Sequence, residues 1–272
     1  MRTWKVPHYD LGLSTRLQRF GPYDPTFRWQ PRQLARAFWT TSGPCTLALR
    51  QTTEGNESEV VGPGAAWTEA FLEQMFNFAP QELPESCSHQ GLRFLSRDLS
   101  GLRVGPVPWA LEVAVAYVLQ QRVRFVEAAR SYVELVQAHG QPAPGPLPLR
   151  LPLNSEQWGR LGVDRLQQAG IDPKRARTLL RVCRLSLDFA PEQLARLHGI
   201  GSWTEQSVRG LAFGDPDAVP LGDVHLPRVV GQFLAPGQFT DDARMLQQLE
   251  PYRGLRFRVI QWIMAASQHR AF

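Results

Sequence analysis

The sequence has few cysteines and no long hydrophobic run, and each shortage excludes a class of protein. Its three cysteines, Cys45, Cys87 and Cys183, lie far apart and form no CxxC pair. Neither a disulfide framework nor an iron–sulfur or zinc ribbon site is therefore expected. The richest apolar stretch, 109–119, is interrupted by Glu112 and is shorter than the roughly 18 residues of a membrane span. The beginning of the chain lacks the apolar region of a secretory signal, so we expect a cytoplasmic protein.

Lysine is also scarce. Lys5 and Lys174 are the only two, so 28 of the 30 basic residues are arginine, and the formal net charge is +5. Arginine binds phosphate with two parallel hydrogen bonds and stacks on bases, which suits a nucleic-acid partner. GC-rich coding produces the same bias, so the charge alone does not decide. At 272 residues, 43% of them hydrophobic, the chain is long enough for one large folded domain or two small ones.

The sequence pattern changes near residue 100. Before it, short β-like segments at 26–29, 45–50 and 59–61 occur with helix-like spacing at 31–40 and 67–78. After it, nearly every segment has a helical period apart from a proline-rich, extended connector. We therefore expect a mostly α protein: a small α+β N-terminal domain, 1–100, and a two-lobed helical core, 101–272, with the active cleft between its lobes. The expected helices are 109–121, 123–139, 154–161, 173–187, 191–197, 202–213, 223–234, 241–249 and 255–269, with a break at 120–123 and the connector at 141–152.

The strongest local signal is the segment LARLHGIGSWTEQSVRG, residues 194–210. Gly199 and Gly201 flank Ile200 between two short helices, so the backbone can turn sharply and the second helix begins with exposed N–H groups. Those groups and the positive end of the helix form a site for an anion. Ile200 is expected to point inward and fix the hairpin to the core. An ordinary corner between two helices, closed by a glycine, is the alternative.

A second motif follows this hairpin. Twenty residues after Trp203, the run VPLGDVHLPRV, 219–229, places Asp223 at the start of the next helix. Together, LHGIGSWT and VPLGDVHLPRV resemble the helix-hairpin-helix (HhH-GPD) DNA glycosylase superfamily, and the 3-methyladenine DNA glycosylase II branch is the most similar. The resemblance extends to WALEVAVAYVLQQRV, IDPKRARTLLRV and EPYRGLRFRV and covers the chain from about residue 101 to its end.

The resemblance implies hydrolysis of the N-glycosidic bond of a damaged, alkylated purine in duplex DNA during base excision repair. Asp223 would be the catalytic carboxylate, because a carboxylate stabilises the positive charge that develops on the sugar and orients the attacking water. The alternative for Asp223 is a simple helix cap. Trp203 stands where bifunctional members carry a Schiff-base lysine, so a reaction without lyase activity is implied.

The resemblance also implies a base pocket and contacts with DNA. Base flipping needs a side chain that fills the gap in the duplex, and Gln121 or Arg122 would supply it from the turn at 120–123, unless that turn is merely solvated. Trp203 would stack on a cationic purine, with a core tryptophan as the alternative. The implied base pocket is Trp203, Ser207 and Trp262, and the implied DNA-binding hairpin is Gly199, Ile200, Gly201, Ser202 and Thr204.

No cofactor is expected. His225 follows Asp223 closely, but no second histidine or cysteine lies at ligand spacing, so we expect no metal site. The resemblance leaves open a monovalent cation on the backbone carbonyls of the hairpin. The expected partner is double-stranded DNA containing damaged bases. We expect a monomer that associates with the nucleoid and has no membrane partner. His198 and Glu205 depart from the family pattern, which keeps a second function open: a non-catalytic protein that binds damaged or distorted DNA.

Overall fold

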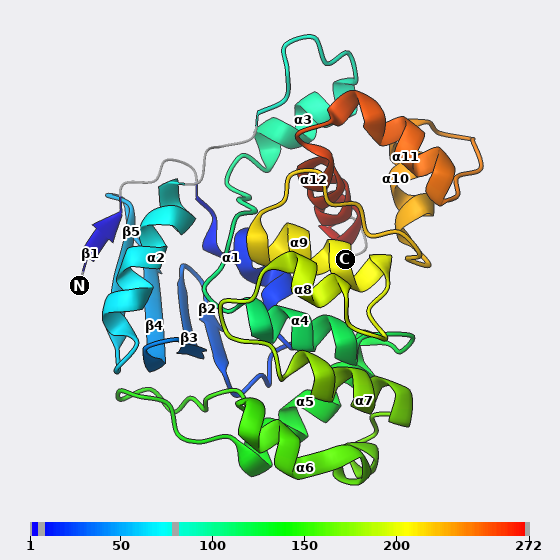
Figure 1. The fold of residues 1–272 in the computed structure, drawn as a ribbon. Helices are drawn as coiled ribbons and strands as arrows, with labels where there is room; N and C mark the ends of the chain where they lie inside the picture. Colours follow the sequence, from blue (N-terminus) through cyan, green and yellow to red (C-terminus); the bar gives the residue numbers. More distant parts are fainter. Residues whose placement is uncertain (1, 5–8, 78–81, 270–272) are drawn as a thin grey trace.

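A five-stranded antiparallel sheet forms one side of the molecule (Figure 1). The computed structural model describes residues 2–4, 9–77 and 82–269. The helix α2 (Ala65–Asn77) packs against β4 and β5, where a helix at 67–78 was expected; Phe78 lies outside the described residues. The strand order is β1-β5-β4-β3-β2, and the strands are β1 Arg2–Trp4, β2 Phe27–Gln30, β3 Gln33–Thr40, β4 Gly43–Gln51 and β5 Asn56–Val61.

The helix predicted at 31–40 is wrong, because this segment forms the strand β3. Leu34, Ala37 and Phe38 have the i, i+3, i+4 spacing of a helix. However, β3 pairs on both sides, with β2 and β4, and both of its faces are covered. Leu34 and Phe38 face the main apolar cluster, and Ala37 packs with the proline-rich connector. A strand buried on both faces lacks the polar alternation that reveals a strand in a sequence.

The helices form two groups beside the sheet (Figure 1). One apolar cluster joins the sheet to the helices α4 to α9, and a second cluster joins α3 to the last three helices. The expected fold class, mostly α with a small α+β part, is confirmed. The bounds are α1 Leu11–Thr15, η1 Arg16–Gln18, α3 Gln90–Asp98, α4 Ala110–Leu119, α5 Phe125–His139, α6 Ser155–Gln168, α7 Pro173–Val182, α8 Pro191–Ala195, α9 Ser202–Phe213, α10 Leu226–Leu234, α11 Asp242–Leu249, η2 Glu250–Tyr252 and α12 Arg256–His269.

Several predicted boundaries change. The helix α6 continues past the expected end at 161 because two helices join across a kink at Gly162, where φ is 62°. The helix α7 ends at Val182 instead of 187. The connector at 141–152 is extended, as expected, and forms one isolated bridge between Pro142 and Arg150. None of the described helices has the length and apolar character needed to cross a membrane.

The helix α3 connects the two predicted domains. It lies within residues 1–100, yet it packs against α12 and belongs to the second apolar cluster. The main cluster likewise contains residues from both the sheet and the central helices. The division at residue 100 therefore stays a prediction, and the contacts of α3 link the N-terminal part to the C-terminal lobe.

Candidate active site

Asp223 lies in the loop before α10, and both oxygens of its half-buried carboxylate are held. Oδ1 accepts hydrogen bonds of 2.8 Å from the backbone N–H groups of His225 and Leu226. Oδ2 accepts a hydrogen bond of 2.8 Å from the indole Nε1 of Trp203. The carboxylate thus caps the beginning of α10, where the helix presents partial positive charge. Three donors from two elements fix its orientation.

Trp203, in the first turn of α9, is part of an aromatic wall beside this carboxylate. Its ring meets the ring of Tyr117 on α4 edge to face, with centroids 5.2 Å apart. Ser207 follows one turn later on α9, is 3% exposed, and forms a hydrogen bond with Tyr117. Burial raises the pKa of Tyr117 well above its ordinary value, so its hydroxyl stays protonated. Sequence reasoning missed Tyr117, although it is the only aromatic residue in the apolar run of α4.

The two hairpin glycines have different roles. Gly199 has φ of +97°, and a Cβ there would collide with the side chain of Thr178 on α7. Gly201 has φ of −104°, and a Cβ at this position would meet nothing within 4 Å, so the backbone does not require glycine there. Ile200 is half-buried against the main cluster, as expected. Ser202 is exposed at the start of α9, which no side chain caps.

The turn between α4 and α5 is tied to the hairpin by a side chain. Gln121 donates from Nε2 to the carbonyl oxygen of Gly199 at 3.1 Å and to Oγ1 of Thr204 at 2.9 Å. Thr204 is 2% exposed, so this contact lies inside the protein. Arg122, the next residue, is exposed and has φ of +57°. Of the two wedge candidates, Gln121 thus points to the hairpin, and Arg122 lies exposed in the turn.

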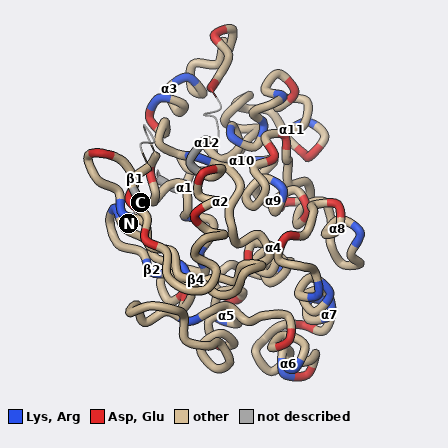
Figure 2. Tube along the Cα trace, turned by 60° about the vertical axis from the view of Figure 1, so that its left-hand side comes forward, with Lys and Arg blue, Asp and Glu red and all other residues tan. Residues whose placement is uncertain are grey.

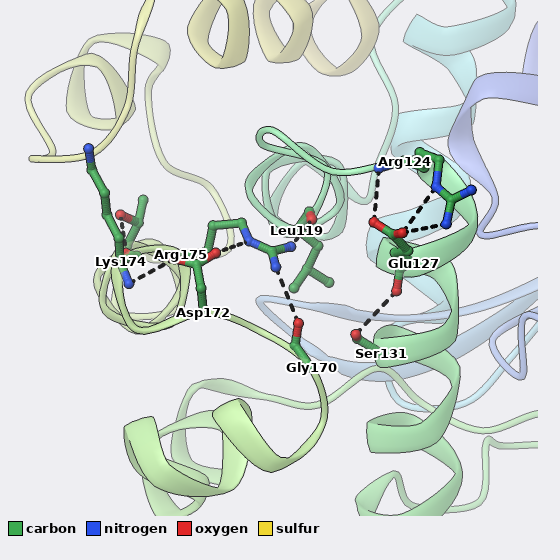
Figure 3. Close-up of polar contacts among 9 residues, drawn as sticks. Leu119, Arg124, Glu127, Ser131, Gly170, Asp172, Lys174 and Arg175 are labelled. Atoms are coloured by element: carbon green, nitrogen blue, oxygen red, sulfur yellow. Dashed lines mark hydrogen bonds and ion pairs between the residues drawn. The ribbon is translucent and has the colours of Figure 1, made fainter.

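A buried arginine fixes the same turn from α7 (Figure 3). Arg175 is 7% exposed and donates to the carbonyl oxygen of Leu119 at 2.7 Å and to that of Gly170 at 3.2 Å. It also pairs with Asp172, which caps α7 as expected. Leu119 is the last residue of α4, so Arg175 satisfies a carbonyl that the helix end leaves without a partner. Sequence reasoning did not single out Arg175, because a helical arginine is usually solvated.

Both basic and acidic side chains lie near the hairpin. Figure 2 shows basic residues along α7 and at the end of α8. Lys174 and Arg177 on α7 are exposed, and Arg196 follows α8 on the surface. Glu205, one turn into α9, pairs with Arg209 at 2.9 Å, and Arg209 also contacts Glu192. Arg209 is thus shared by two glutamates, so these three side chains together keep a net negative charge beside the start of α9.

Trp262 is not brought to this wall by any contact among the described residues. It is 1% exposed, lies in the second apolar cluster, and has the guanidinium of Arg258 5.2 Å from its ring centre. Its ring therefore offers almost no surface to a base. His225 is exposed next to Asp223, and the described residues contain no group of three His, Cys, Asp or Glu side chains that could hold a metal ion.

Three carbonyl groups of the hairpin already accept hydrogen bonds within the protein. The carbonyl oxygen of His198 accepts a hydrogen bond of 3.3 Å from the guanidinium of Arg181. The carbonyl oxygen of Gly199 accepts from Gln121, and that of Leu197 accepts from the N–H of Ile200. A cation here would compete with these donors and would meet the positive charge of Arg181. We assign no cation to the hairpin.

Comparison with known proteins bears on the architecture. No family model and no curated protein matches the chain. Among solved structures, a 3-methyladenine DNA glycosylase from Archaeoglobus fulgidus superposes with a TM-score of 0.80 at 17% identity, over 99% of both chains. This chain has the DNA glycosylase fold.

Two further structures support the same assignment of fold. An 8-oxoguanine glycosylase/lyase from Clostridium acetobutylicum, in complex with double-stranded DNA, has a TM-score of 0.69 and 12% identity, over 97% of this chain and 93% of that chain. A DNA-3-methyladenine glycosidase from Bacillus halodurans has a TM-score of 0.51 and 20% identity, over 67% and 86%. The DNA glycosylase fold agrees with the resemblance carried by the hairpin and Asp223.

Proposed function

We propose that this chain is a DNA glycosylase that hydrolyses the N-glycosidic bond of a damaged, alkylated purine in duplex DNA, as a step of base excision repair. The observation that carries the proposal is the carboxylate of Asp223, held by three hydrogen bonds beside the aromatic wall. This arrangement occurs at the hairpin of a chain with the DNA glycosylase fold. Two of the structures described above are named as 3-methyladenine enzymes, which supports an alkylated purine as the substrate.

The proposed chemistry rests on charge. When the base leaves, positive charge develops on the sugar, and a fixed negative carboxylate beside it lowers the energy of the transition state. The three donors orient Asp223 before the substrate arrives, so little reorganisation is needed. Trp203 and Tyr117 form electron-rich walls, and such rings attract cationic bases. A cationic alkylated purine is therefore the substrate class that this site suits best.

We further propose that the enzyme has no lyase activity. A Schiff base needs an amine that can reach the sugar, and residue 203 is a tryptophan whose N–H group already binds Asp223. Lys174, the only lysine among the described residues, is exposed on α7. Borohydride should therefore trap no covalent adduct with DNA, and strand breaks should appear only after alkali treatment. A trapped adduct would contradict this part of the proposal.

Binding to DNA is assigned to the hairpin and the turn beside it. The N–H groups at the start of α9 would bind a phosphate, and Arg122 would fill the gap left by a flipped nucleotide, while Gln121 and Thr204 position the turn. Gly201→Asp tests the phosphate contact, because the site has space for the side chain. It should weaken binding to every duplex and flatten the slope of log affinity against log salt by about 0.9.

A matched control for Gly201→Asp is Gly159→Asp on α6. Gly159 is also exposed with nothing within 4 Å of a Cβ, so this variant adds the same charge away from the hairpin. It should keep the wild-type affinity and salt slope. Circular dichroism would confirm that both variants fold. If folded Gly201→Asp bound undamaged DNA like the wild type, the hairpin would be only a structural corner.

The activity is tested with duplexes that carry a methylated purine, hypoxanthine or uracil. We expect base release from the methylated purine and its loss in Asp223→Asn, which keeps an oxygen for the helix N–H groups but removes the charge. Asp241→Asn, at the N-cap of α11, is the matched control and should stay active. Equal release by Asp223→Asn would overturn the role of Asp223. Tight binding to abasic or distorted DNA without release of any base would favour the non-catalytic binding protein.

A further inference from the structure

A second polar site lies on another face of α4. A cavity of about 220 Å³ is enclosed between α4, α5, α6, β3 and the loop after α7. Glu112 of α4 lines it, whereas Tyr117 of the aromatic wall is five residues further along the helix and so lies on a different face. None of the residues that line the cavity belongs to the site around Asp223. The cavity is therefore separate from the proposed active site.

Glu112 is the unusual residue of this cavity. It is 7% exposed, and its Oε2 atom is buried without a hydrogen-bond partner. Burial raises the pKa of Glu112, against the effect of the nearby Arg36 and of backbone N–H groups. Arg36 does not satisfy Oε2: it donates to the carbonyl oxygen of Gln18 and lies 4.6 Å from the ring centre of Trp109. A buried acceptor left in this state is costly, so a donor that reached Oε2 from the cavity would be favoured.

The other walls of the cavity are mostly apolar, with aliphatic side chains, three aromatic rings and the polar residues Asn154, Ser155 and Ser186. Trp39, Tyr132 and Trp158 contribute rings. The indole N–H of Trp39 is already donated to the carbonyl oxygen of Pro152 at 2.8 Å, and the hydroxyl of Tyr132 bonds to Thr26. The polar tips of these two rings thus already have partners within the protein. A matching ligand needs a planar apolar body and N–H donors directed at the carboxylate.

We propose that this cavity is a binding site for a small planar organic cation whose N–H donors pair with Glu112. A carboxylate and aromatic faces both attract positive charge, and a cation pairs with the carboxylate more strongly than a neutral donor does. The size fits, because a cavity of about 150 Å³ is enough to hold benzene. The 220 Å³ present here leaves room for one ring that carries an amidinium group.

The test uses benzamidine as the probe, with benzyl alcohol as the neutral and benzoate as the anionic comparison. Isothermal titration calorimetry of the full chain should show one benzamidine site, with affinity at least about tenfold higher than for benzyl alcohol, as a charged hydrogen bond predicts. Benzoate should not bind. Glu112→Gln, which keeps the shape of the side chain, should lose this tenfold preference. Leu187→Phe, which narrows the cavity, should weaken both ligands.

Two control variants locate the signal. Asp223→Asn should leave the titration unchanged, because the aromatic wall beside Asp223 is the other place where a cation could bind. Glu156→Gln removes an exposed carboxylate of α6 and should also have no effect. Glu112→Gln should still release base if the enzyme is a glycosylase, so failure of this proposal is distinguishable from failure of the proposed function.

Three results would overturn the proposal. They are no binding of benzamidine, with a crystal structure showing only water in the cavity; equal affinity for benzamidine and benzyl alcohol; and full benzamidine affinity in folded Glu112→Gln. A crystal soaked with benzamidine would show directly whether the amidinium faces Glu112. Thermal melting followed by circular dichroism would establish that each variant is folded before it is titrated.

Discussion

Replacing Trp203 by phenylalanine tests how the carboxylate of Asp223 is held. Trp203→Phe removes the indole N–H that donates to Oδ2 at 2.8 Å, but it keeps an aromatic ring against Tyr117. The two backbone N–H groups still hold Oδ1. The carboxylate therefore keeps its place in the loop and loses only one of three constraints on its orientation.

The size of the effect follows from the type of bond. A hydrogen bond to a charged group contributes about 1.5–3 kcal/mol. Its loss frees Oδ2 to turn toward water, and a misplacement of the order of 1 Å in a catalytic group can lower a rate about 100-fold. We expect the single-turnover rate constant for base release to fall by about 10-fold to 100-fold, since one of the three donors is lost. Affinity for an abasic-site analogue should change by less than about threefold, because the hairpin is unaltered.

The assay is single-turnover release of a methylated purine with excess enzyme, together with fluorescence anisotropy for binding. Trp67→Phe is the matched control: it also shortens a half-buried tryptophan that contacts another aromatic ring, Phe71, but it lies on α2. The control should keep the wild-type rate. A rate for Trp203→Phe within about twofold of wild type would refute the reasoning, because the bond to Oδ2 would then not orient the carboxylate.

Three other predictions concern the hairpin, the turn and the buried carboxyl. Gly199→Ala should lower the free energy of unfolding in urea by about 1–3 kcal/mol, because φ is +97° and Thr178 fills the space that a Cβ would need. Gly201→Ala should change this free energy by less than about 0.5 kcal/mol. Equal losses in the two variants would contradict the different roles of the two glycines. Arg122→Ala should slow base release and weaken binding to abasic DNA far more than binding to undamaged duplex; uniform weakening would indicate a simple phosphate contact. Burial raises the pKa of Glu112 above its ordinary value, so its contribution to stability is complete below the unfolded pKa and is lost as the pH rises through the folded pKa. As the pH rises through this range, the Tm of Glu112→Gln should therefore increase relative to the Tm of the wild type. A difference in Tm that does not change with pH would contradict this prediction.

The helical part of the fold could be predicted largely from the sequence. The caps and periods of α7 and α9 are local signals: Asp172 and Pro173 open one helix, and the hairpin glycines precede the other. The strand β3 could not be recognised in the same way, because its burial on both faces comes from tertiary packing. The length of α6 was also hidden, since Gly162 looks like a helix end but forms a kink.

The candidate site could likewise be predicted only in part from the sequence. The position of Asp223 before α10 and the turn of the hairpin were predictable because both depend on neighbours in the sequence, whereas their roles in catalysis and DNA binding stay predictions. The contacts that hold the hairpin and the neighbouring turn come from distant segments: Gln121 reaches Gly199 across 78 residues, and Arg175 reaches Leu119 across 56. No periodicity or spacing rule connects such pairs. Trp203 could be placed near the site by its position, but the choice between a base wall and a bond to Asp223 required the geometry.

The first turn of α9 links all parts of the proposed reaction. Thr204 and Gly199 bind Gln121 and so position the turn that carries Arg122, while Trp203, between them, binds Asp223. A phosphate bound at the start of α9 would therefore fix the wedge and the carboxylate relative to the same point of the DNA backbone. In the proposed reaction, the residue at position 203 would decide the chemistry. A lysine there could attack the sugar, whereas Trp203 would orient the carboxylate and leave the attack to water.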